Sequence, residues 1–112
     1  MSSPDRAAAF TLSSERHVAF GALITLRLAG QPERRFTRQE AAIVARGLQA
    51  LATGASREPQ IYMSPIASDY DLEARLIGDN LAVTLEGAPS AVLALPEAFA
   101  LIAELKRAAG IE

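Results

Sequence analysis

The chain has 112 residues, of which 50% are hydrophobic and 21% are charged, and its formal net charge is −2. This length and composition predict one globular domain over residues 1–112 and exclude a chain that is disordered throughout. The absence of cysteine excludes disulfides and cysteine-bound metals, and the single histidine, His17, excludes a multi-histidine metal site within one chain.

The N-terminus lacks the apolar segment of a secretory signal. The longest apolar run, residues 18–26, is far shorter than the roughly 20 residues that span a bilayer. We therefore expect a cytoplasmic protein without membrane contact. Ten of the eleven basic residues are arginine, which together with the abundant alanine indicates GC-rich coding and favours a bacterial origin.

Charge is distributed unevenly along the chain. Residues 1–57 carry eight basic and four acidic side chains, whereas residues 58–112 carry three basic and nine acidic ones. Such asymmetry can mark a partner surface, or it can reflect attraction between the two halves in the fold.

The first structural elements are expected after a disordered tail of residues 1–9. Apolar residues alternate over 24–28, as on one face of a β-strand. The Gly-x-Pro segment at 30–32 then predicts a turn. A short strand follows, and its Phe36 is expected to fill the core.

A helix is predicted next, with clear signals at both ends. Thr37 is a good N-cap and forms a capping-box pattern with Glu40, while Gly54 is the expected stop. The apolar stripe between them has helical spacing and consists of Ala41, Val44, Ala45, Leu48 and Ala52.

The second half contains further strands and a second helix. Residues 60–66 are typical of a strand that is interrupted by a proline, which indicates an edge position or a bulge. Residues 72–77 alternate as a strand, and Gly78 suits a primed hairpin turn into residues 81–85. Pro96 fits the first turn of the second helix. Its apolar stripe is Ala98, Leu101, Ile102, Leu105 and Ala109, followed by Gly110 as the stop.

These elements predict an α+β fold with a mainly antiparallel sheet and two helices on one face. A shift of 57 residues aligns 28–52 with 85–109, and seven of these 25 positions are identical. The sequence thus indicates an internal duplication of a β-β-β-α unit, over about residues 17–53 and 74–110.

Three arginines beside the first helix are the strongest candidate binding site. Arg34, Arg35 and Arg38 lie near a helix N-terminus, where backbone N–H groups favour anions, and guanidinium groups bind phosphate well. The structural alternative is a solvated short strand whose charge is partly neutralised by Glu33 and Glu40. The corresponding stretch of the second half contains no arginine, so neither the turn nor the helix needs these side chains.

Two other polar patterns favour a structural interpretation. Asp69, Asp71 and Glu73 alternate and could face a hard cation together, but a charged strand edge produces the same pattern. His17 has no recognisable nucleophile or orienting partner at catalytic spacing, so a surface histidine explains it better. We expect no catalytic residues, no metal ion and no cofactor.

Tyr62, Met63 and Tyr70 are the candidate interface residues, since an edge strand with tyrosine and methionine resembles the core of a protein interface. An ordinary peripheral core is the alternative. The leading hypothesis is a non-catalytic protein-interaction or regulatory domain that binds another protein, itself as a homodimer, or both. Binding of an anion or nucleic acid through the arginines is the alternative, although the acidic net charge and few aromatic residues disfavour nucleic acid. An enzyme with an unrecognised Asp/Arg site is a third possibility.

Overall fold

The computed structural model describes residues 9–66, 70–85 and 88–111, so nearly all of the predicted tail lies outside the described part. Two helices and seven strands follow one another along these residues. They are β1 (Phe10–His17), β2 (Gly21–Leu28), β3 (Arg34–Phe36), α1 (Arg38–Thr53), β4 (Gln60–Met63), β5 (Leu72–Ile77), β6 (Asn80–Leu85), β7 (Ala88–Ala94) and α2 (Leu95–Ala109).

The strands form two antiparallel sheets, with the orders β1-β2-β3 and β4-β5-β6-β7. The predicted α+β class and antiparallel pairing are confirmed. The expected single sheet is divided instead, because no ladder joins the described strands of the first half to those of the second. We refer to β1-β2-β3 as sheet A and to β4-β5-β6-β7 as sheet B.

The predicted ends of α1 are confirmed in detail. The Glu40 backbone N–H donates to the Thr37 hydroxyl at 3.1 Å, and the Glu40 carboxylate accepts from the Thr37 backbone N–H at 3.0 Å. Gly54 ends the helix in the left-handed conformation with a φ of 77°, which costs glycine little. These caps satisfy backbone groups that an isolated helix end would leave without partners.

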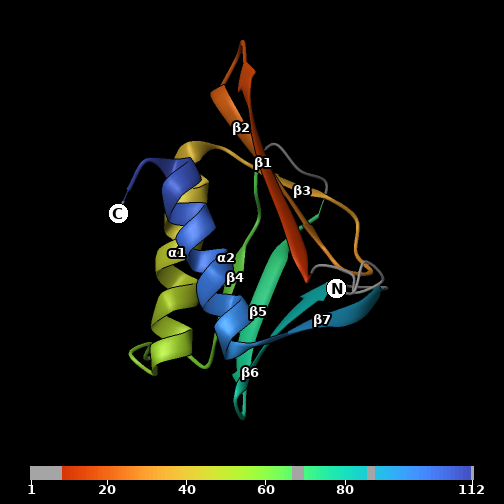
Figure 1. The fold of residues 1–112 in the computed structure, drawn as a ribbon, viewed down its shortest axis with the longest axis vertical. Helices are drawn as coiled ribbons and strands as arrows, with labels where there is room; N and C mark the ends of the chain where they lie inside the picture. Colours follow the sequence, from red (N-terminus) through yellow and green to blue (C-terminus); the bar gives the residue numbers. More distant parts are fainter. Residues whose placement is uncertain (1–8, 67–69, 86–87, 112) are drawn as a thin grey trace, which may run out of the picture.

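The two helices lie side by side and antiparallel (Figure 1). Their direction follows from one contact, because Arg38 at the start of α1 donates to the backbone carbonyl of Ala109 at the end of α2, at 3.4 Å. In α2 the carboxylate of Glu97 accepts from the Ala94 backbone N–H at 2.9 Å, although alanine offers no side-chain cap in return.

One continuous core joins both helices to both sheets. Each helix contacts strands of sheet A and of sheet B. All five predicted stripe residues of α2 are buried, as are four of the five in α1, where Ala52 is half-buried. The largest apolar side chains that are almost fully buried are Phe36, Ile24, Leu26, Leu28, Leu48, Leu72, Leu81, Leu93, Leu101, Leu105 and Val44.

Strand boundaries in the second half largely follow the sequence pattern. β5 and β6 pair across a two-residue turn in which Gly78 has a φ of 59°, as the predicted primed turn requires. β4 ends at Met63, before the proline at position 65 that was expected to interrupt it.

The β2–β3–α1 and β6–β7–α2 segments share a pairing register. Ile24 pairs with Phe36 in sheet A, and Leu81 pairs with Leu93 in sheet B, which is the same pair shifted by 57 residues. Likewise the Leu26–Arg34 pair corresponds to Val83–Ala91. This correspondence is compatible with an internal duplication, which stays a prediction.

Candidate functional site

Arg34 is completely buried, with 0% of its surface exposed, where sheet A meets sheet B. Its Nε donates to the backbone carbonyl of Asp71 at 2.7 Å, and its Nη2 donates to that of Thr84 at 3.4 Å. Its Nη1 donates to the side-chain oxygen of Gln31 at 2.8 Å, and the amide nitrogen of Gln31 donates to the Val83 carbonyl at 3.0 Å. The Arg34 and Gln31 side chains thus connect sheet A to β5 and β6.

The electrostatics of this contact are those of a buried cation held by neutral oxygens. Burial lowers the pKa of the Arg34 guanidinium, and the nearby Asp71 carboxylate partly opposes that shift. No ion pair within 4.0 Å joins Arg34 to a carboxylate among the described residues. Because its donors are directed at acceptors of the protein itself, the contact stabilises the packing of the two sheets.

The structure does not bring the three predicted arginines onto one surface. Successive strand residues point to opposite sides, so Arg35 is exposed on the outer face of sheet A while Arg34 faces the core. Arg38 is exposed at the start of α1, where it reaches the Ala109 carbonyl. Anion binding through this cluster stays a prediction, and only Arg35 and Arg38 are exposed to take part in it.

An exposed hydrogen bond joins β4 to Asp71, whose backbone carbonyl also accepts from Arg34. The Tyr62 hydroxyl on β4 donates to a carboxylate oxygen of Asp71, the residue just before β5. This hydrogen bond, followed by one from Ser64, lowers the pKa of Asp71, and the positive charge of Arg34 acts in the same direction. The same bond raises the pKa of Tyr62, to which the negative charge of Asp71 also contributes.

Removing the hydroxyl by Tyr62→Phe should raise the pKa of Asp71 toward its ordinary value of 3.8. The bond stabilises the fold above that value, and its contribution is lost as the pH falls through the lowered pKa of Asp71. At high pH the contribution is present below 10.0, the ordinary value for tyrosine, and is lost as the pH rises through the raised pKa of Tyr62. An NMR titration of the Asp71 carboxyl carbon in both proteins measures the shift. An unchanged titration would mean that the bond does not form in solution.

The other predicted interface residues lie near this pair. Tyr62 is 63% exposed and Tyr70 is 41% exposed, whereas Met63 is half-buried and packs against the core. Two further exposed apolar side chains were not predicted, namely Ile66, which is 70% exposed, and Ile43 on α1, which is 50% exposed. Neither exposure could be predicted from the sequence, because Ile43 lies in an apolar stretch of the predicted helix and Ile66 ends the predicted strand 60–66.

The acidic run and the histidine are placed as follows. Asp69 lies outside the described residues. Glu73 on β5 accepts a long hydrogen bond of 3.5 Å from the Thr84 hydroxyl. His17 ends β1, where its Nδ1 accepts from the backbone N–H groups of Ala19 and Phe20 at 3.1 and 3.2 Å. This histidine therefore holds the β1–β2 turn.

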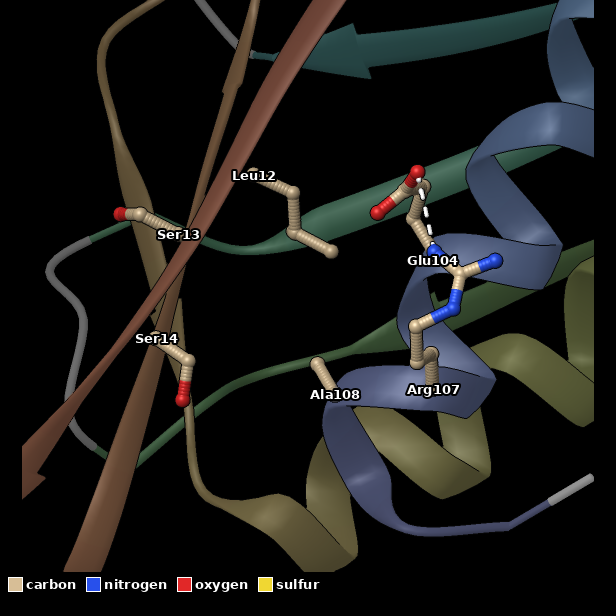
Figure 2. A pocket seen from close by; sticks show the side chains of 6 residues that line it. All are labelled: Leu12, Ser13, Ser14, Glu104, Arg107 and Ala108. Carbon is tan, nitrogen blue, oxygen red and sulfur yellow. Dashed lines mark ion pairs between the residues drawn. The ribbon is translucent and has the colours of Figure 1, made fainter.

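A pocket of about 160 Å³ lies between β1 and α2. Figure 2 shows Leu12 pointing from β1 toward α2, where Glu104 and Arg107 form an ion pair of 3.1 Å. The lining residues are Leu12, Ser13, Ser14, Glu104, Arg107 and Ala108, and none of them belongs to the predicted sites. The pocket was not predictable from local patterns, because β1 and α2 lie at opposite ends of the chain.

The fold and these contacts define a small α+β domain built from two antiparallel sheets and a helix pair. Comparison with protein-family models, with curated proteins and with solved structures yielded no match to this chain. Neither described helix has the length and apolar character required to cross a membrane.

Proposed function

We propose that this chain is a non-catalytic protein-interaction domain that binds a protein partner and also self-associates. The observation that carries the proposal is the exposure of Tyr62, Ile66 and Tyr70 within nine consecutive positions. Tyrosine is enriched at protein interfaces, because its ring supplies contact area and its hydroxyl supplies a hydrogen bond.

Two hydrogen bonds hold Tyr62 and the backbone of Ile66 in place. The carboxylate of Glu40 on α1 accepts a 2.9 Å hydrogen bond from the Ile66 backbone N–H, and Tyr62 is bonded to Asp71. Groups that are already held in place lose less conformational entropy when a partner binds. This supports a preformed binding surface.

Ile43 extends this surface onto α1. Glu40 accepts from the Ile66 backbone N–H, and a Cβ added at Gly47 would lie 3.2 Å from the Ile61 side chain, so both positions of α1 face residues 61–66. Ile43 lies one helical turn from each of them, and so on the same side of the helix. We call the exposed side chains of Tyr62, Ile66, Tyr70 and Ile43 the β4 surface.

The double variant Tyr62→Ser/Ile66→Ser tests the β4 surface. If these side chains are central contacts, their loss should weaken partner binding by about tenfold or more, as for interface residues that cost over ~1.4 kcal/mol. The measurement is quantitative capture of binding proteins by the immobilised variant and wild type. Phe99→Ser is the matched control, since Phe99 is a partly exposed aromatic residue on α2. Equal capture by the double variant and wild type would contradict the proposal for this surface.

A separate observation supports self-association. Residues 1–57 are basic in balance and residues 58–112 are acidic, which favours contact between a basic surface of one copy and an acidic surface of another. Sedimentation equilibrium at low and high salt measures it. We expect a dimer that weakens as the salt concentration rises, and a monomer at high protein concentration under both conditions would remove this part of the proposal.

A further inference from the structure

The two sheets have four edge strands, and three of them carry features that discourage pairing with another strand. Short length, proline and irregular register all protect sheet edges. β3 has three residues, and β4 has four residues between Pro59 and Pro65. β7 contains Pro89, and its pairing with β6 shifts register. β1 has eight residues, no proline and an unbroken register with β2.

No strand of the described residues pairs with the side of β1 away from β2, which we call its open side, and the backbone groups on that side can be identified. The Ala29 backbone N–H donates to the Ala9 carbonyl at 3.1 Å, so Ala9 is in a hydrogen-bonded pair. Such pairs alternate in an antiparallel ladder. Residues 11, 13 and 15 therefore bond to β2, while Phe10, Leu12, Ser14 and Arg16 direct their N–H and C=O groups away from it.

β1 also lines the pocket beside α2, through Leu12, Ser13 and Ser14. Leu12 and Ala108 provide apolar lining, and the exposed Glu104–Arg107 ion pair provides one charge of each sign (Figure 2). A strand added to β1 would gain backbone hydrogen bonds on one side and side-chain contacts in this pocket on the other.

We propose that a second copy of this chain pairs its β1 antiparallel with β1 of the first, about a two-fold axis at Ser13. This proposal rests on the self-association proposed above, and it assigns the contact to the β1 strands of the two copies rather than to a basic and an acidic surface. The extended segment 9–17 is centred on Ser13, so this register uses all of its open backbone groups. The β4 surface then stays available for a different protein.

The β1 sequence is complementary to itself in this register. Phe10 lies opposite Arg16 of the second copy, and Thr11 lies opposite Glu15, so no like charges meet across the strands. Leu12 of the second copy lies opposite Ser14, which places the leucine beside the pocket.

A cysteine cross-link tests the axis directly. The chain contains no cysteine, so the single variant Ser13→Cys can form only intermolecular disulfides. Directly opposed residues in a non-hydrogen-bonded pair have Cα atoms about 4.5 Å apart, which lies within the range for a disulfide. We expect Ser13→Cys to cross-link under mild oxidation at least about tenfold faster than Ser90→Cys, which places the cysteine at an exposed serine of β7. Equal rates for the two variants would overturn the proposed axis.

A charge exchange at the same position provides a second test. Ser13→Lys and Ser13→Glu each place like charges opposite each other, so each should raise the dimer Kd by about tenfold or more. An equimolar mixture of the two should restore the dimer, and Ser90→Lys should dimerise like wild type. Circular dichroism checks that each variant is folded, as expected for exposed positions.

The outcomes separate this inference from the broader proposal. If wild type dimerises and the Ser13 variants dimerise equally well, then β1 is not the interface and self-association uses another surface. If wild type stays monomeric at the highest attainable concentration, both self-association and the β1 interface are wrong.

Discussion

Arg34→Ala should lower the free energy of unfolding by about 3 kcal/mol, because it removes a buried donor group and leaves its acceptors without partners. The carbonyls of Asp71 and Thr84 and the side-chain oxygen of Gln31 all accept from this guanidinium. Relief of the desolvation of the Arg34 charge offsets part of the loss. Urea-induced unfolding of wild type and variant, followed by circular dichroism, measures the difference.

Arg35→Ala is the matched control, since Arg35 is the next residue on β3 and is exposed. Its effect should stay within about 0.5 kcal/mol, as for most surface substitutions. Arg34→Lys should lie between the two, because lysine keeps the charge but not the planar set of donors. If both alanine variants were equally stable, water would be satisfying the three acceptors and Arg34 would not connect the sheets.

Phe36→Ala is expected to cost about 3–5 kcal/mol, the range for removing a buried phenylalanine. Phe36 has no exposed surface and pairs with Ile24 in sheet A. Removal of its ring would therefore leave a cavity that the surrounding core cannot fully close. The same urea experiment measures the loss.

Phe99→Ala serves as the comparison, because the Phe99 ring on α2 is 43% exposed and leaves no enclosed cavity when removed. Its cost should be about 1 kcal/mol or less. Equal losses for Phe36→Ala and Phe99→Ala would mean that the core relaxes around position 36.

The helices could be predicted from the sequence almost to the residue, because their signals are local. A capping box needs two residues three positions apart, as in Thr37 and Glu40, and a glycine such as Gly54 ends a helix through its own conformational freedom. Strands 72–77 and 80–85 could be predicted for the same reason, since alternation and a two-residue turn lie within one short segment.

The division of the strands into two sheets could not be predicted in this way. It depends on whether strands that are far apart in the sequence pair with each other, and local patterns do not determine that. The burial of Arg34, however, could have been predicted from the sequence. Phe36 was expected to face the core, and strand side chains two positions apart share a face, so Arg34 must face the core as well. Its two backbone carbonyl acceptors lie 37 and 50 residues away and could not be predicted from any local pattern.

Sequence reasoning proposed Tyr62, Met63 and Tyr70 as interface residues, which stays a prediction, but it did not predict the Asp71 contact that positions Tyr62. The alternation of acidic residues drew attention to a possible cation site. In the structure one of these carboxylates, that of Asp71, accepts a hydrogen bond from the hydroxyl of Tyr62 on the edge strand β4. That contact depends on the pairing of β4 with β5, which brings residues nine positions apart together.

The contacts of each helix with both sheets also constrain how this chain can fold. Local hairpins such as β1–β2 and β5–β6 can form early. The apolar surface of each half, however, is covered only when the two halves pack together, because each helix contacts strands of both. The Arg34 contacts close loops of 37 and 50 residues. The chain loses the conformational entropy of these loops before burial of apolar surface stabilises the closed form. We therefore expect docking of the two halves to limit the folding rate, with a slower approach to the native state than in a helical bundle of similar length.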